Sequence, residues 1–385
     1  MRRVVAALGC ALVTAGAQAS APAAATRVRF ASFNIEELSR VKLDQVDDAG
    51  RGAHPQLKKA AEIVQRLRPD VLLLNEIDFD EPRRNARLFV ERYLRHGQGG
   101  QPGLDFEHVY FEPVNTGVPT GRDLDRDGKS DSPGDAYGFG RYPGQYGMAL
   151  LSRFPIDAAA ARTFRLLKWR DQPGNLIPDG REGRPAWYSP DDVALLRLSS
   201  KSHWDVPLRI GAATVHVLAA HPTPPIFDGP EDRHGRRMFD EVRLLRDLIA
   251  GGPGSEYVVD DQGRKGSLPP DALFVVMGDL NAEPAKDAGS YGRPAIAQLL
   301  DLPRVQDPRP QSEGAASGRT PGPPEYPERR TCEFGRIDYV LPSTGLAVAG
   351  AGVFWPAPSD PLHALVAPPD RSSDHRLVWV DVEVK

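Results

Sequence analysis

The chain has 385 residues, of which 40% are hydrophobic and 26% are charged, and its formal net charge at pH 7 is −4. This composition supports a large buried core and excludes a disordered chain, a collagen and a coiled coil. With this mildly acidic net charge, the protein has no overall positive potential to attract the phosphates of a nucleic acid. A nuclease that uses bound cations is still possible.

The first residues predict an export signal. Arg2 and Arg3 give a positively charged start, a short apolar stretch runs on to Ala17, and Ala17-Gln18-Ala19 fits a cleavage site. We therefore expect a signal peptide over residues 1–19, with cleavage as late as residue 25 as the alternative, and a secreted or periplasmic protein. The apolar stretch is too short to span a membrane, and we expect no transmembrane segment.

Strand-like apolar runs recur along the rest of the chain, with helical patterns between them. The expected strands are Val28–Phe33, Val71–Leu74, Met148–Leu151, Val193–Leu198, Ala213–Ala220, Leu273–Met277, Ile337–Leu341 and Leu377–Val384. Helices are expected over Leu57–Leu67 and Met238–Ile249, which end before Pro69 and Gly251. Because strands and helices alternate and no linker or repeat divides the chain, we expect one α/β domain over residues 26–385.

Long loops separate these elements and are expected to rim a site at one edge of the scaffold. By composition they are Asn115–Tyr146, Asp171–Pro190, Pro222–Gly235, Gly251–Pro270 and Pro303–Arg330.

Polar side chains stand at the ends of the apolar strands, where they can converge on one crevice. They are Asn34 and Glu36, Glu76, His221, Asp279 and Asn281, Asp338, and Asp374 with His375. Strand alternation is expected to point Asn34 and Glu36 to the same face.

These residue types suit metal-assisted hydrolysis of a phosphate ester. The carboxylates of Glu36, Glu76 and Asp374 are hard oxygen donors of the kind that Mg²⁺ or Mn²⁺ prefers. Asp279 is a candidate base and Asn281 a candidate donor to a phosphate oxygen. Imidazoles titrate near neutrality, so His221 and His375 suit proton transfer and charge stabilisation, and Asp338 could orient His375.

The same constellation resembles the endonuclease/exonuclease/phosphatase superfamily. The matching segments occur in family order and are Phe33-Asn34-Ile35-Glu36, Pro69–Glu76, Gly147–Arg153, His221-Pro222, Gly278–Ala282, Arg336–Val340 and Ser373–Leu377. The resemblance implies a four-layer sandwich in which two mixed β-sheets are flanked by helices.

The resemblance also implies roles for the site residues. Glu76 would bind the metal with Glu36 and Asp374 nearby, Asn34, Asp279 and Asn281 would hold phosphate and water, and His221 and His375 would flank the phosphorus with Asp338 behind His375. The expected partner is a phosphate-ester substrate, which could be nucleic acid, a phospholipid headgroup or a small phosphoester. No protein partner is evident.

A separate acidic motif repeats aspartate at every second position and then turns on Gly128. Asp123, Asp125 and Asp127, with Asp131 further on, suggest a structural Ca²⁺ loop, and a solvated acidic turn is the alternative. Position twelve of the loop is Gly134 rather than glutamate, which argues against an EF-hand. A non-catalytic, exported calcium-binding recognition module is therefore the rival to the hydrolase.

Two further groups have open interpretations. Arg233, Arg236 and Arg237 could bind substrate phosphate or form an exposed helix start. His203, beside Trp204, is a candidate substrate contact.

Overall fold

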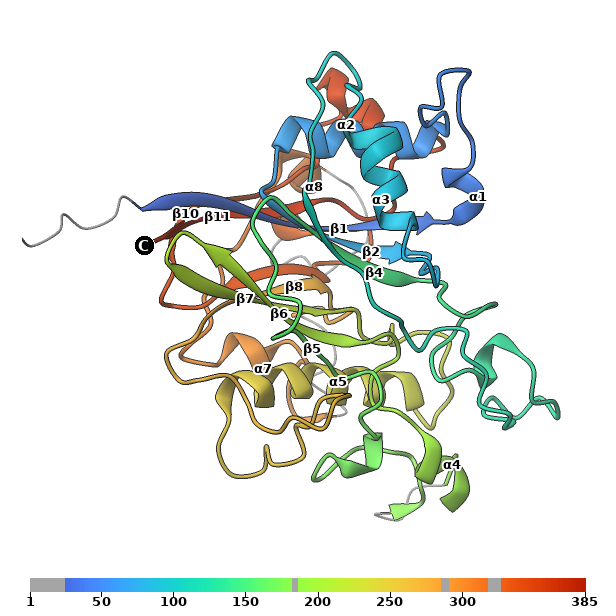
Figure 1. The fold of residues 1–385 in the computed structure, drawn as a ribbon. Helices are drawn as coiled ribbons and strands as arrows, with labels where there is room; N and C mark the ends of the chain where they lie inside the picture. The colour runs from blue at the N-terminus through green and yellow to red at the C-terminus, as the bar shows by residue number, and fades with distance from the viewer. Residues whose placement is uncertain (1–24, 182–185, 285–290, 318–326) are drawn as a thin grey trace, which may run out of the picture.

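Two mixed β-sheets form the centre of the molecule (Figure 1). The structure is a computed structural model, and it describes residues 25–181, 186–284, 291–317 and 327–385. The predicted signal peptide, residues 1–19, lies outside the described residues. In the part of the chain that the structure describes, no helix has the length and apolar character needed to cross a bilayer.

The first sheet has the strand order β10-β11-β1-β2-β4-β3, and the second has the order β5-β6-β7-β8-β9. Strands β1 and β2 pair in parallel, as do β7 and β8, whereas the other neighbours are antiparallel. The strands are β1 Thr26–Leu38, β2 Val71–Ile77, β3 His108–Tyr110, β4 Gly147–Ser152, β5 Arg162–Thr163, β6 His203–Ile210, β7 Ala213–Ala220, β8 Leu273–Asp279, β9 Asp338–Pro342, β10 Ala347–Val353 and β11 Val378–Val384.

Alternation along the strands of the second sheet builds two separate cores. On β7, Val215 and Val217 pack toward the first sheet, whereas Leu218 and Ala220 pack toward helix α5 (Arg233–Ala250). Burying both faces explains why these strands are nearly continuous apolar runs. Each buried aliphatic side chain contributes on the order of 2 kcal/mol.

Helices cover the outer faces of the two sheets and complete four layers (Figure 1). Helix α2 (Pro55–Leu67) buries Leu57, Ile63 and Val64 in the core of the first sheet, and α5 covers the second sheet. This arrangement confirms the expected α/β sandwich. The other helices among the described residues are α1 Arg40–Leu43, α3 Asn85–Phe89, α4 Pro190–Leu195, α7 Ala297–Leu300, α8 Glu313–Ser317, the π-helix η1 Val90–Leu94, and the 3₁₀ turns η2 Pro133–Asp135, η3 Trp169–Asp171, η5 Pro327–Arg329 and η6 Pro361–Leu365.

All but one of the expected strands are present. The prediction for Val193–Leu198 is wrong, because its first residues belong to α4. Ser189 caps this helix through a reciprocal capping box with Asp192, and Pro190 stands in the first turn. Strand β6 and the short or glycine-containing strands β3, β5 and β10 are not among the expected strands.

The topology brings the polar strand ends to one edge of the sandwich. Strands β7 and β8 are parallel, so His221, just after β7, and Asp279, the last residue of β8, emerge on the same side. Strand β9 runs antiparallel to β8 and begins with Asp338, which pairs with Asp279. In the first sheet, Asn34 of β1 pairs with Asn75 of the parallel β2.

Candidate active site

Asp279 is the centre of a buried polar cluster between the two sheets. Its Oδ2 accepts a hydrogen bond from Asn34 Nδ2 at 3.0 Å. The same oxygen lies 3.5 Å from His221 Nε2 and 3.8 Å from His375 Nε2. Burial raises the pKa of the Asp279 carboxyl to about 7, even though the charge of His375 lowers it. Asp279 is thus poised to gain and lose a proton near neutral pH.

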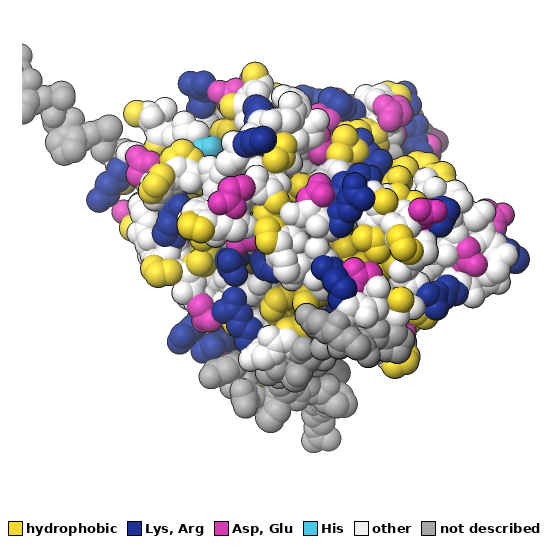
Figure 2. All heavy atoms as spheres, turned by 90° about the horizontal axis from the view of Figure 1, so that it is seen from below, with side chains coloured by type: hydrophobic (Ala, Val, Ile, Leu, Met, Phe, Trp, Pro, Cys, Tyr) yellow, Lys and Arg dark blue, Asp and Glu magenta, His cyan; other side chains and the backbone are white. Residues whose placement is uncertain are grey.

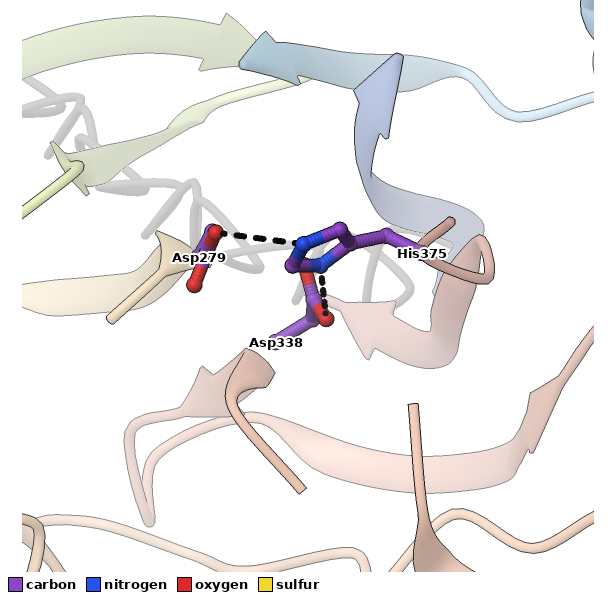
Figure 3. A group of neighbouring side chains, drawn as sticks. All are labelled: Asp279, Asp338 and His375. Carbon is purple, nitrogen blue, oxygen red and sulfur yellow. Dashed lines mark hydrogen bonds and ion pairs between the residues drawn. The ribbon is translucent and has the colours of Figure 1, made fainter. Parts of the chain in front are cut away.

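His375 lies between two aspartates (Figure 3). Its Nδ1 is 2.9 Å from Asp338 Oδ2, and its Nε2 is directed toward Asp279. Ser373 holds this segment on β1, because its hydroxyl donates to Asn34 O at 2.7 Å and accepts from His375 N at 3.0 Å. Burial alone would lower the pKa of His375, but Asp338 and Asp279 together raise it well above the ordinary value. His375 is therefore a cation at neutral pH.

His221 has the opposite electrostatic character. Burial lowers its pKa well below the ordinary value, and the positive charges of Lys201 and His375 lower it further. At neutral pH it is an uncharged imidazole beside Asp279. Asn281 completes this side of the cluster, since its backbone N–H donates to Asp279 Oδ1 at 3.0 Å and its Nδ2 donates to Pro222 O at 3.0 Å.

Glu76 adjoins the cluster from the end of β2. Its Oε1 accepts from Asn34 Nδ2 at 3.0 Å, and its Oε2 accepts from Glu37 N at 3.3 Å. Asn34 thus links the Glu76 carboxylate to the Asp279 carboxylate. Burial raises the pKa of Glu76, opposed by the hydrogen bond from Asn34, and the charge of Asp374 adds to the rise.

Glu36 does not follow the expected alternation. The register of β1 with β2 shifts beyond Asn34, and Glu36 and Glu37 have φ values of +50° and +58°. Instead of joining Glu76, the Glu36 carboxylate accepts from Asp374 N at 2.9 Å and pairs with Arg371 Nη2 at 3.2 Å. Within the part of the chain that the structure describes, the carboxylates of Glu36, Glu76 and Asp374 do not all lie within 4.8 Å of one another.

The residues at this edge nevertheless suit a divalent cation. Glu76 and Asp374 are oxygen donors, and the charge of Asp374 helps to raise the pKa of the half-buried Glu76; the buried Asp279 also has a raised pKa. A bound cation would offset that clustered negative charge. The tight group of Asp279, Asp338 and His375 could also hold a metal by distance, but its spacing is explained by the His375–Asp338 hydrogen bond.

The sequence matches the model of the endonuclease/exonuclease/phosphatase family over residues 31–375. The chain belongs to this family.

Solved structures of similar fold come from several organisms. A structure described as endonuclease/exonuclease/phosphatase from Beutenbergia cavernae DSM 12333 is 18% identical with a TM-score of 0.50, over 93% of this chain and 72% of that chain. A family protein from Leptotrichia buccalis C-1013-b is 13% identical with a TM-score of 0.47, over 93% and 100% of the two chains. Truncated Caenorhabditis elegans TDP2 is 16% identical with a TM-score of 0.44, over 93% and 98%. No protein with a curated description matches the sequence.

One buried residue at this site lies outside the segments that carried the resemblance to the endonuclease/exonuclease/phosphatase family. Lys201 is only 6% exposed, and its Nζ donates to Pro222 O at 3.3 Å. Burial lowers its pKa, opposed by the charges of Glu241, Asp279 and Glu76. The signal available in the sequence is the alternation of polar and apolar residues over His203–Ile210, just after this lysine, which is typical of a strand but is not among the expected strands.

Four other candidate phosphate or substrate contacts make their hydrogen bonds and ion pairs elsewhere in the protein. Arg236 and Arg237 are buried or half-buried and donate to backbone carbonyls, and Arg233 pairs with Glu231, so the phosphate-binding interpretation has no support. His203 is buried, with Ser199 Oγ 2.7 Å from its Nδ1 and Glu241 O 3.0 Å from its Nε2. Through these contacts it joins the segment before β6 to helix α5.

The acidic motif forms a cluster with a different membership from the one expected. Ligand atoms of Asp123, Asp125 and Asp135 lie within 4.8 Å of one another, with neither Asp127 nor Asp131 in the group. Asp127 accepts from Lys129 N at 2.8 Å as an ordinary turn residue. The Ca²⁺ assignment stays a prediction.

Proposed function

We propose that this protein is an exported, divalent-metal-dependent hydrolase of phosphate esters. The observation that carries the proposal is the arrangement around Asp279, which faces a neutral imidazole and a charged one, with Asp338 behind the charged ring. Two histidines with oppositely shifted pKa values beside one carboxylate with a raised pKa are a pattern of acid–base sites.

Each residue has a distinct task in this proposal. Asp279 accepts a proton from the attacking water, since its pKa of about 7 suits a base at neutral pH. The His375 cation stabilises negative charge that develops on the phosphate oxygens, and Asp338 fixes its ring through Nδ1. Neutral His221 hydrogen-bonds to the reacting group from the opposite side, and Asn34 holds the Asp279 carboxylate in place.

The proposed cation is Mg²⁺ or Mn²⁺. Glu76 would hold it, with Asp374 and Glu36 nearby, and when bound it would neutralise charge on the phosphoryl oxygens. Glu36 would first have to exchange its pairing with Arg371 for the cation, which makes it the weakest of the three candidates.

The substrate is a phosphodiester or a phosphomonoester. The net charge of −4 favours a compact phosphoester over a long polyanion. Figure 2 shows one face on which acidic, basic and apolar side chains are interspersed, in keeping with that balance. Export is part of the proposal and is supported by the signal-like sequence of residues 1–19.

The test is a substrate panel with a variant that removes one active-site group. Plasmid DNA, RNA, bis-p-nitrophenyl phosphate, p-nitrophenyl phosphate and phospholipids are incubated with wild type, His375→Ala and His96→Ala, the last being a histidine far from the site in sequence. We expect wild type and His96→Ala to hydrolyse the same substrate, and His375→Ala to lose at least about 100-fold in kcat/KM. Full activity of His375→Ala, or no hydrolysis by wild type, would contradict the proposal.

A further inference from the structure

Lys201 occupies a position that is costly for a cation. The residue lies in the turn before β6 and is 6% exposed. A buried ammonium has three N–H donors to satisfy. Among the described residues, one hydrogen bond satisfies it, to Pro222 O at 3.3 Å. Two donors therefore have capacity for another acceptor.

The ammonium is tied to the catalytic cluster through one carbonyl. Pro222 directly follows His221, and its carbonyl oxygen accepts from both Lys201 Nζ and Asn281 Nδ2, the second at 3.0 Å. The backbone N–H of Asn281 in turn donates to Asp279 Oδ1 at 3.0 Å. Lys201 is thus connected to the base through Pro222 O and Asn281, and its charge is close enough to lower the pKa of His221.

Helix α5 holds the lysine in this place through Glu241, which is fully buried. Glu241 Oε1 accepts from Ser200 N and Oε2 accepts from Thr223 N, both at 2.6 Å. One carboxylate therefore joins the residue before Lys201 to a residue just after His221. His203 Nε2 makes a further hydrogen-bond contact between this segment and helix α5, at Glu241 O. The loop that carries Lys201 is fixed to the loop that carries His221.

We propose that Lys201 binds a non-bridging oxygen of the phosphate group under attack, and that Glu241 is the residue that positions it. A compact ammonium is a general phosphate-binding group. In a site with little water, the effective dielectric constant is low and its attraction for an anion is stronger than in solution. The proposal rests on the function proposed above, because it assigns Lys201 to the same phosphate. The alternative is that Lys201 only neutralises the buried charge of Glu241.

The experiment compares Lys201→Met, which keeps the length of the side chain, with Lys201→Arg and with Lys58→Met as an exposed control. Hydrolysis of the substrate found for wild type, competitive inhibition by inorganic phosphate and the melting temperature are measured for each. We expect Lys201→Met to lose about 100-fold in kcat/KM, as for loss of one oxyanion donor. Its inhibition constant for phosphate should weaken at least about tenfold, while Lys58→Met matches wild type and Lys201→Arg retains most of the phosphate affinity.

A merely structural lysine gives a different result. Lys201→Met would then melt at a lower temperature and leave the phosphate inhibition constant of the folded protein unchanged, which overturns the proposal. If Lys201→Met does not fold, Glu241→Gln replaces it, because this variant keeps the ammonium but loosens its loop. Glu241→Gln should weaken phosphate inhibition, and an unchanged constant would again overturn the proposal. Absence of hydrolysis by wild type itself contradicts the proposed function, separately from the role of Lys201.

Discussion

At the residue scale, the site depends on burial acting differently on neighbouring groups. The pKa of Asp279 rises because its charged form is desolvated, whereas that of His375 rises because two aspartates face it. No carboxylate raises the pKa of His221 enough to offset the effect of burial, so the pKa of His221 falls. The protein therefore holds three titratable groups at different protonation states around one carboxylate oxygen, with His221 Nε2 3.5 Å and His375 Nε2 3.8 Å from Asp279 Oδ2.

Because the pKa of Asp279 is raised by folding, this residue should make the folded protein less stable as pH rises. The effect tests the raised pKa without any substrate. A carboxyl whose pKa is raised by folding binds its proton more tightly in the folded state, so stability falls between the unfolded pKa near 4 and the folded pKa of about 7. We expect Asp279→Asn to gain free energy of unfolding relative to wild type by roughly 2 kcal/mol or more between pH 4 and pH 8.

The measurement is guanidinium unfolding of both proteins across this pH range, without divalent cations. Asp271→Asn, at an exposed aspartate, serves as the control for the loss of a surface charge. A difference between Asp279→Asn and wild type that stays constant with pH would show that the carboxyl is not held at a raised pKa.

The sequence predicted which residue types gather at the site but not all of their neighbours. Asn34, Glu76, Asp279, Asp338 and His375 could be found because each stands next to a recognisable apolar strand. Lys201 and Glu241 could not, since their importance comes from long-range contacts between a loop and a helix. Their roles, like those of the predicted metal ligands, remain predictions.

At the element scale, strand ends and helix caps decide where side chains meet. Parallel pairing of β7 with β8, and antiparallel pairing of β8 with β9, brings His221, Asp279 and Asp338 to one edge. The sequence indicated this convergence because the apolar runs fixed most strands. It did not indicate the change at Glu36, where positive φ values end the alternation, or the start of α4, where a cap overrides an apolar run.

The cap of α4 can be tested directly. Ser189 Oγ accepts from Asp192 N, and the Asp192 carboxylate accepts from Ser189 N at 3.0 Å. We expect Ser189→Ala to lower the free energy of unfolding by about 1 kcal/mol, and Ser189→Asp, which can still cap, to lose less. Denaturant unfolding of the two variants and wild type measures the difference. Equal stability of all three would show that the cap does not explain why a helix forms here.

At the scale of the whole molecule, each of the two sheets contributes a different part of the candidate active site. The first sheet provides Asn34 and Glu76, and the second provides Asp279 and Asp338, so the cluster exists only when the sheets pack face to face. The sandwich could be predicted from alternating strands and helices together with the family resemblance. The order of strands within each sheet could not, because it is set by packing between distant segments rather than by local pattern.

The central claim is that acids, amides and imidazoles from both sheets form one cation-dependent hydrolytic site. The most direct measurement is hydrolysis of bis-p-nitrophenyl phosphate, or of whichever phosphoester the panel identifies, by wild type after removal of divalent cations with EDTA and again after addition of Mg²⁺ or Mn²⁺. We predict that EDTA reduces the rate to background and that either cation restores it. Hydrolysis that persists unchanged in EDTA would contradict the account.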